Sequence, residues 1–217
     1  MPSLPHIVSP LSAAWCGWTM LCLLLTAVLG EWLQPGVISQ AYDSLVVRTE
    51  RTYKDAPVNT IGQFFVALFR IGTIGMGLCL CLEPEGRFAF ISFGVVSGVI
   101  IAVLLVKMLC NALVSYTFEL SRRFAGTYEM YGNIMTLACL ALYPALLLSM
   151  RFGTIIAHRW VLGGAAVFFL LLWIYRSFRQ FVISPKAVLY WIVYVATLEL
   201  LPLGALYYLS EKMLSQL

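Results

Sequence analysis

Long, unbroken stretches of apolar residues run through most of the chain, separated by shorter polar segments. About six of these stretches are long enough to cross a hydrocarbon core of roughly 30 Å, which takes about 20 helical residues. Because apolar residues follow one another instead of alternating with polar ones, helices are favoured over the strands of a barrel. The pattern predicts an all-α fold, a polytopic transmembrane helical bundle. The predicted spans are Leu11–Leu33, Ile61–Leu82, Phe88–Leu113, Tyr131–Met150, Trp160–Tyr175 (the shortest) and Pro185–Leu209.

The longest polar segment, residues 34–60, follows the first span and has a helical pattern of its own. Its less polar positions recur at helical spacing, at Ile38, Tyr42, Leu45, Thr49 and Tyr53. Such a pattern is typical of a short amphipathic helix in the membrane interface, attracted to anionic lipids. A helix that docks a partner protein would have the same pattern, so that alternative stays open, although we favour lipid.

The composition supports a membrane protein with one integral domain, residues 1–217. Hydrophobic residues make up 61% of the 217 residues, against roughly 45–50% in soluble domains. Charged residues make up 11%, where about 25% is usual. This excludes a soluble globular domain and a disordered tail. The cysteines lie within apolar stretches and form no CxxC pair, so neither disulfides nor a metal site is expected.

Positive charge is distributed unevenly between the two sides of a six-span chain. Ten of the 14 Lys and Arg residues fall in the first, third and fifth loops or at the adjoining span ends. The positive-inside rule then places these loops in the cytoplasm and both termini on the outer side. Arg70 and Lys107 are expected at the inner ends of their spans, with side chains that snorkel to the interface. The residues assigned to the cytoplasmic interface are Arg48, Arg51, Lys54, Arg122, Arg123, Arg176 and Arg179.

Glycines within two predicted spans indicate close helix packing. Gly72 belongs to a cluster in the second span, and Gly94 and Gly98 are four residues apart in the third. Small residues at this spacing let helix backbones approach closely in lipid. We expect both groups to pack within the bundle, while packing against another subunit stays an alternative.

The sequence offers few groups for catalysis. His6 and His158 lie outside the predicted spans, and the aspartates, Asp43 and Asp55, lie in the first loop. No nucleophile elbow, phosphate-binding loop or metal-ligand motif is present. The basic residues form no stripe typical of nucleic-acid binding. We therefore expect neither an enzyme nor a cofactor, nor a nucleic-acid partner.

One acidic residue, Glu199, is placed near mid-membrane by its position in the last predicted span. It lies about 21 Å from the start of that helix at 1.5 Å per residue, and Pro202 follows within one turn. A charged carboxylate at this depth costs about 2.5–3.5 kcal/mol or more, so it must be neutral, paired or hydrated. Ser97, Thr73 and Tyr143 fall at similar depth and are candidate hydrogen-bonding groups.

The stretch from Tyr190 to Pro202, with its Thr-Leu-Glu-x-x-Pro core, resembles the C-terminal signature of the "domain of unknown function 4271" family. The segments around Tyr143-Pro144 and Tyr175-Arg176 resemble the fourth and fifth spans of that family. The resemblance implies a polytopic inner-membrane protein of Bacteroidota, with both termini in the periplasm by the charge count above. It gives weight to Glu199 and Pro202 but implies no reaction.

Two functions remain open at this point. The first is a non-enzymatic accessory subunit of a larger inner-membrane complex, in envelope protein translocation, secretion or membrane-protein assembly, whose partners are other integral membrane proteins and anionic lipids. The second is a small proton- or ion-coupled transporter that uses Glu199. The missing catalytic groups and small extramembrane segments favour the first. The lone intramembrane carboxyl favours the second.

Overall fold

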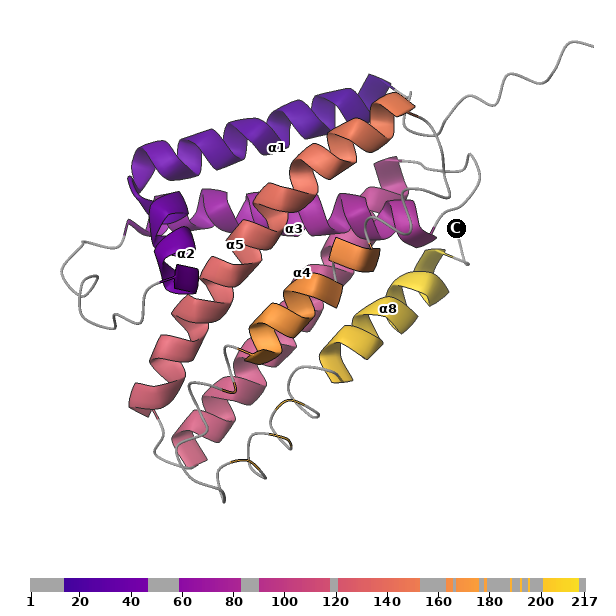
Figure 1. Ribbon diagram of the computed structural model, residues 1–217. Helices are drawn as coiled ribbons and strands as arrows, with labels where there is room; N and C mark the ends of the chain where they lie inside the picture. Colours follow the sequence, from indigo (N-terminus) through magenta and orange to yellow (C-terminus); the bar gives the residue numbers. More distant parts are fainter. Residues whose placement is uncertain are drawn as a thin grey trace, which may run out of the picture.

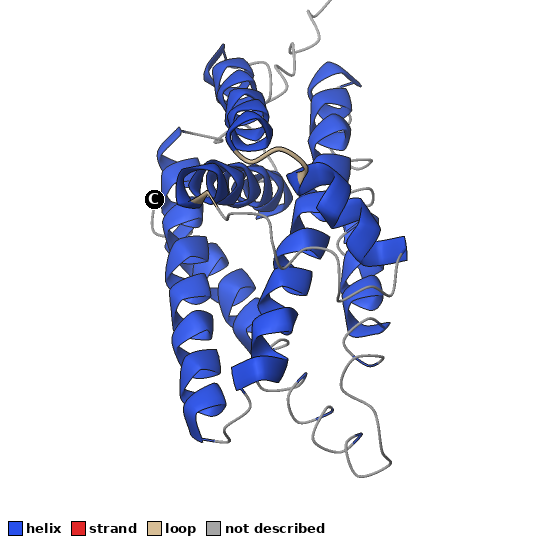
Figure 2. Ribbon diagram, turned by 90° about the vertical axis from the view of Figure 1, so that its left-hand side faces the viewer, coloured by secondary structure: helices blue, strands red, loops and turns tan. Residues whose placement is uncertain are grey.

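In the computed structural model, helices make up nearly all of the described chain (Figures 1 and 2). The structure describes residues 14–46, 59–82, 90–117, 121–152, 163–165, 167–175 and 201–214, with Phe178, Val188, Ile192 and Val195. The labelled helices are α1 (Ala14–Leu33), α2 (Val37–Val46), α3 (Thr60–Leu82), α4 (Phe90–Thr117), α5 (Ser121–Phe152) and α8 (Leu201–Leu214). A further apolar helix covers Gly163–Tyr175.

Helices α1 and α3 form a close antiparallel pair (Figure 1). Gly30 near the end of α1 lies against Val66 in the first half of α3, whereas Gly72 further along α3 lies against Leu23. A Cβ on Gly30 would come within 2.7 Å of Val66 Cγ2 and 3.3 Å of its backbone nitrogen. The absence of a side chain at Gly30 therefore sets how closely the two helices approach.

The candidate spans alternate in direction along the chain. Because Arg70 on α3 contacts Thr136 on α5, and Gly77 lies near Leu142, α3 and α5 run the same way. Helix α4, which lies between α3 and α5 in the sequence, runs in the opposite direction (Figure 1). Its Ser97 lies beside Gly75 of α3. This alternation is the arrangement that successive crossings of one membrane produce.

The main hydrophobic core lies where four helices, α1, α3, α4 and α5, meet. Phe69, Met20, Met76 and Ile100 are among its large buried side chains, and Cys79 and Cys139 fill smaller spaces. A second, smaller cluster joins Ile134 of α5 to Trp173 and Val195. Burial of these side chains fixes which face of each helix points inward.

The sequence predicted six spans, and the structure supports an all-helical membrane protein with four long candidate spans among the residues it describes. These are Trp15–Leu33, Thr60–Leu82, Phe90–Cys110 and Tyr131–Leu148. The fifth predicted span corresponds to the shorter apolar helix Gly163–Tyr175, and the last residues of the sixth form the first part of α8. The count of six therefore stays a prediction.

Helix α2 occupies the first part of the segment predicted to hold an interfacial helix. Both carboxylate oxygens of Glu31 accept hydrogen bonds at its start, from Gly36 N at 2.8 Å and Ile38 N at 3.0 Å. Gly36 has a φ of 93°, a conformation that glycine adopts without strain. Val37 and Ala41 are buried, while Ile38 and Tyr42 are exposed. Contact of this exposed face with lipid stays a prediction.

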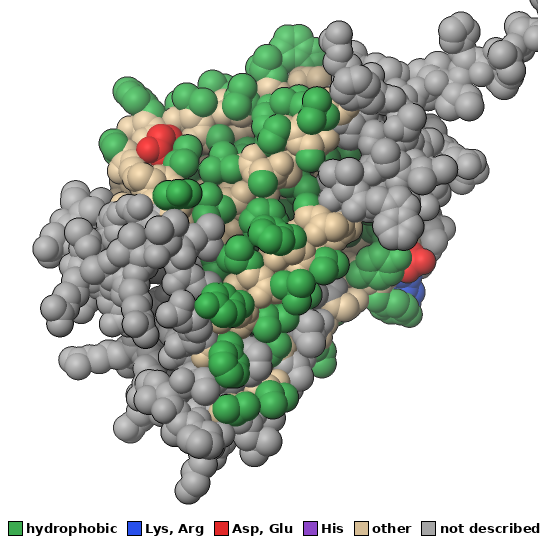
Figure 3. Space-filling view, viewed as in Figure 1, with side chains coloured by type: hydrophobic (Ala, Val, Ile, Leu, Met, Phe, Trp, Pro, Cys, Tyr) green, Lys and Arg blue, Asp and Glu red, His purple; other side chains and the backbone are tan. Residues whose placement is uncertain are grey.

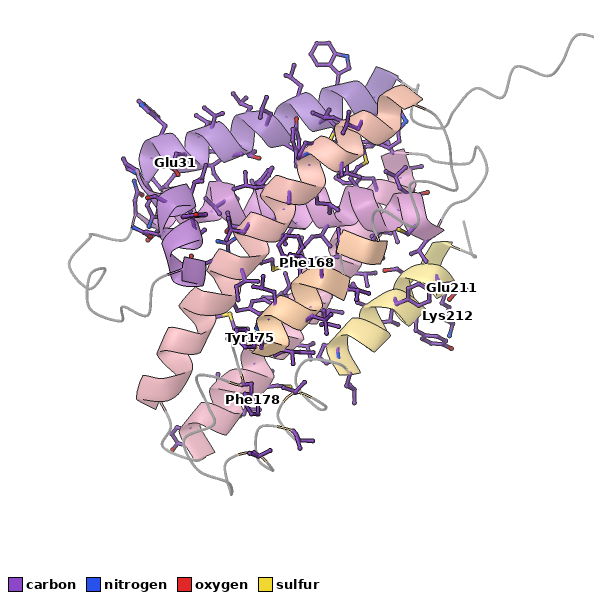
Figure 4. All side chains as sticks on the ribbon, in the orientation of Figure 1. Glu31, Phe168, Tyr175, Phe178, Glu211 and Lys212 are labelled. Atoms are coloured by element: carbon purple, nitrogen blue, oxygen red, sulfur yellow. The ribbon has the colours of Figure 1, made fainter. Side chains whose placement is uncertain are left out.

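Apolar side chains cover much of the described surface between two ends where charged groups lie. In Figure 3, green side chains spread over the visible helices, with few coloured charges among them. Glu31 lies at one end of the bundle, and Glu211 and Lys212 lie at the other (Figure 4). A wide apolar surface bounded by charged ends is what a membrane-spanning bundle requires.

Candidate functional site

Arg70 lies in the middle of α3 and its side chain extends across to α5. It is about 15 Å along the helix from Thr60 at 1.5 Å per residue. The partly buried side chain donates a hydrogen bond from Nε to Thr136 Oγ1, at 2.8 Å. The expectation that Arg70 sits at the inner end of its span is therefore wrong. From the middle of α3 the guanidinium is far from either membrane interface, and it bonds instead to the Thr136 hydroxyl oxygen within the bundle.

Arg70 contacts α5 at Gly132 and Thr136. The Thr136 hydroxyl donates to the Gly132 carbonyl oxygen at 2.9 Å, so its oxygen is free to accept from Arg70. A Cβ on Gly132 would lie 3.2 Å from Arg70 Nη1 and 3.6 Å from Nη2. The guanidinium can rest against the α5 backbone because residue 132 has no side chain.

Lys107 of α4 reaches the neighbouring position of α5. Its Nζ lies 3.8 Å from the centroid of the Tyr131 ring and 5.9 Å from that of Trp173. An ammonium group over aromatic faces is stabilised by the ring quadrupoles, more so where water is scarce. Because Tyr131 and Gly132 are adjacent, α3 and α4 bring two cations to consecutive residues of α5.

The polar residues that the sequence placed at mid-membrane depth do not form one cluster among the described residues. The Tyr143 hydroxyl donates to the Met20 carbonyl oxygen of α1 at 2.9 Å. Thr73 is fully buried, and neither its hydroxyl nor that of Ser97 has a hydrogen-bond partner among the described residues. Pro202 is partly buried near the start of α8, and Glu199 lies outside the described residues.

The two glycine groups differ in environment. Gly72 is buried against Leu23 of α1, inside the bundle. Gly94 and Gly98 of α4 are exposed, and a Cβ on either would meet nothing within 4 Å among the described atoms. The internal packing expected for Gly94 and Gly98 is therefore absent from the described structure. The cause is the rotation of α4, which turns Val96 and Ile100 toward the core.

Most of the predicted cytoplasmic basic residues lie outside the described part of the chain. Arg122 and Arg123 lie in the first turn of α5, which begins well before the predicted span. The residues outside the described ranges are Arg48, Arg51, Lys54, Arg176 and Arg179.

Sequence reasoning missed three residues that form hydrogen bonds between helices or at helix ends, of which only Thr136 belongs to the Arg70 site. Thr136, Asn59 and Glu31 each bond a neighbouring helix or its end. An Asn before an apolar run is a recognised N-cap signal, which could have identified Asn59. No local signal marks Thr136 as the partner of Arg70.

Two basic groups, with hydroxyl and aromatic neighbours, can bind and orient an anionic group. Among the described residues, no group of His, Cys, Asp or Glu side chains lies close enough together to bind a metal ion.

Neither the comparison with curated proteins nor the comparison with solved structures found a match. The family described as "Domain of unknown function (DUF4271)" matches residues 17–209, most of the chain. The protein therefore belongs to the DUF4271 family.

Proposed function

We propose that this protein is a non-enzymatic accessory subunit of a larger inner-membrane complex in Bacteroidota. The chain crosses the membrane six times, with both termini in the periplasm and residues 34–60 at the cytoplasmic interface, where anionic lipids bind the amphipathic segment. The process in which it takes part is envelope protein translocation, secretion or membrane-protein assembly. Its partners are other integral membrane proteins.

The observation that carries this proposal is the open small-residue face of α4. Gly94, Gly98 and Ala102 follow at four-residue spacing and are all exposed. Helices embedded in lipid associate through such small residues because their backbones can come close together. Gly72 and Gly30 allow such close packing between α1 and α3 within the chain. Among the described residues, no helix packs against Gly94 and Gly98 of α4.

The burial of α4 supports the same conclusion. Only 11% of the residues in the most apolar 18-residue window of Phe90–Cys110 are buried, against 50% of those in the corresponding window of Thr60–Leu82 in α3. A strongly apolar span would be stable in lipid without small residues on its outer face. Their presence there favours a protein neighbour over lipid alone.

The experiment is purification of the full-length chain in mild detergent, followed by mass spectrometry of the proteins that remain bound. We expect a stoichiometric integral membrane partner with the wild-type chain. Gly94→Leu/Gly98→Leu should release this partner without lowering the melting temperature of the purified chain. The matched control is Gly17→Leu, at an open glycine of α1, which should retain the partner. A partner that stays bound to the α4 variant would contradict the proposal.

A small proton- or ion-coupled transporter that uses Glu199 is the second candidate. The observation that favours it is the presence of Arg70 and Lys107 between helices, since ionisable groups inside a bundle often mark ion pathways. Recovery of the wild-type chain as a lone monomer or homodimer would favour this function.

A further inference from the structure

The Arg70 side chain has donors that its protein contacts do not use. Its Nε–H is directed to Thr136, while Nη1 and Nη2 lie near the place that a Gly132 Cβ would fill. Within the described part of the chain, Thr136 is the one hydrogen-bond acceptor of this side chain, and no carboxylate forms an ion pair with it. The Nη1 and Nη2 groups therefore remain available to an anion.

The contacts on α5 also orient the guanidinium. Since Thr136 occupies Nε, the available edge is the one formed by Nη1 and Nη2. Two parallel N–H groups on this edge match the two oxygens of a carboxylate or of a phosphate. Lys107 adds a second positive charge beside the adjacent residue, Tyr131, which raises the attraction for an anion in this part of the bundle.

Depth along the helix decides between a carboxylate and a lipid phosphate. Helix α3 has 23 residues and is about 35 Å long at 1.5 Å per residue, so Arg70 lies near its middle. Lipid phosphates lie outside a hydrocarbon core of about 30 Å, roughly half that thickness away from the middle of a span. The Arg70 side chain is directed across to α5, and its bond to Thr136 opposes snorkelling toward a headgroup.

We propose that Arg70 binds a carboxylate carried by a transmembrane helix. Two sources share this chemistry. One is Glu199 of the same chain, which the sequence places near mid-membrane and which lies outside the described residues. The other is a Glu or Asp in a transmembrane helix of another protein. The proposal does not depend on the accessory-subunit function, because Glu199 would satisfy it within one chain.

The test uses the full-length chain in mild detergent and follows both its melting temperature and the proteins that co-purify. The variants are Arg70→Met, Arg70→Lys, Glu199→Gln and the double variant Arg70→Met/Glu199→Gln. Lys212→Met is the matched control, because it removes an exposed cation of α8 that takes no part in the proposed site. Vesicles of phosphatidylglycerol, compared with phosphatidylcholine, probe for a lipid phosphate.

The two sources give different results. If Glu199 is the ligand, Arg70→Met lowers the melting temperature by several degrees, and the double variant regains part of the loss because no carboxylate is left unpaired. If the ligand belongs to another protein, Arg70→Met leaves the purified chain as stable as wild type and releases a partner that Lys212→Met retains. Arg70→Lys keeps the positive charge but lacks the two parallel N–H groups of Nη1 and Nη2. Its loss of melting temperature or of partner binding should therefore be smaller than that of Arg70→Met.

Three results would overturn the proposal. The first is an Arg70→Met chain that is more stable than wild type and keeps every co-purifying protein, since this is the behaviour of a cation with no counter-ion. The second is stabilisation of wild type, but not of Arg70→Met, by phosphatidylglycerol, which would identify a lipid phosphate as the ligand. Should Arg70→Met fail to accumulate, Arg70→Lys decides: reduced stability or partner loss supports the proposal, and wild-type behaviour in both readouts overturns it.

Discussion

The hydroxyl of Tyr143 on α5 donates a 2.9 Å hydrogen bond to the backbone carbonyl oxygen of Met20 on α1. The Tyr143 ring also lies against Phe69 of α3, with 6.0 Å between the ring centroids. One side chain thus connects three candidate spans. In lipid, apolar contact between helices provides little driving force, so interhelical hydrogen bonds and close packing hold the bundle together.

Tyr143→Phe removes this hydrogen bond and keeps the ring. We expect a loss of about 0.5–1.5 kcal/mol of unfolding free energy, the usual net contribution of one hydrogen bond. Thermal unfolding in mild detergent, followed by circular dichroism, measures the difference. The control is Tyr207→Phe at an exposed tyrosine of α8, which should melt with wild type. Equal melting of Tyr143→Phe and wild type would show that the bond contributes nothing.

Asn59 joins the end of α1 to the start of α3 through one side chain. Its Nδ2 donates to the Leu33 carbonyl oxygen at 3.0 Å, and its Oδ1 accepts from Ile61 N at 3.1 Å. Asn59→Ala should cost about 1 kcal/mol or more, since it removes an N-cap together with the bond to α1. Asn59→Asp keeps the cap and loses the donor, so its stability should lie between those of Ala and wild type in chemical unfolding. An Asp variant less stable than Ala would contradict the capping role.

Two glycines of α1 should respond in opposite ways to alanine. A Cβ at Gly30 would lie 2.7 Å from Val66 Cγ2 and 3.3 Å from its backbone nitrogen, so Gly30→Ala must separate α1 from α3. Gly17 has nothing within 4 Å, and Gly17→Ala should stabilise the helix by about 0.5–1 kcal/mol through reduced backbone entropy. The melting temperatures of both variants give the sign directly. Stabilisation by Gly30→Ala would show that the helix pair tolerates wider spacing.

Cysteine labelling in intact cells tests the proposed orientation. Cysteines placed at Ser3 and Ser215 should react with membrane-impermeant thiol reagents, and a cysteine at Ser121 should react with permeant reagents only. The reason is the excess of positive charge in the loops assigned to the cytoplasm. If Ser3 and Ser215 proved to lie on opposite sides, the span count would be odd, and Trp160–Tyr175 would be the predicted span that fails to cross.

Helix positions could be predicted from the sequence where apolar runs begin and end abruptly. The run Ile61–Leu82 corresponds to α3, Thr60–Leu82, because Asn59 caps it at the first turn. The fourth run was expected to start at Tyr131, yet α5 begins at Ser121. Polar residues continue a helix as readily as apolar ones, so hydropathy marks the membrane-spanning part and not the end of the helix.

The candidate site could not be predicted because it depends on which helix faces meet. Gly72 and Gly98 have similar apolar neighbours in sequence, yet one is buried against Leu23 and the other is open. Arg70 and Thr136 lie on different helices, and no periodicity in either segment reveals that they bond. Tertiary packing decides both outcomes.

Photo-crosslinking in intact membranes tests most directly whether α4 contacts another protein. A photoreactive residue is placed at Leu105, seven residues from Gly98 and hence on the same face, where the side chain is 62% exposed. The control position is Leu25 on the outer face of α1, which is 55% exposed. The account predicts a single protein adduct of defined mass from Leu105 and none from Leu25. Lipid adducts alone at both positions would contradict an accessory subunit that docks through α4.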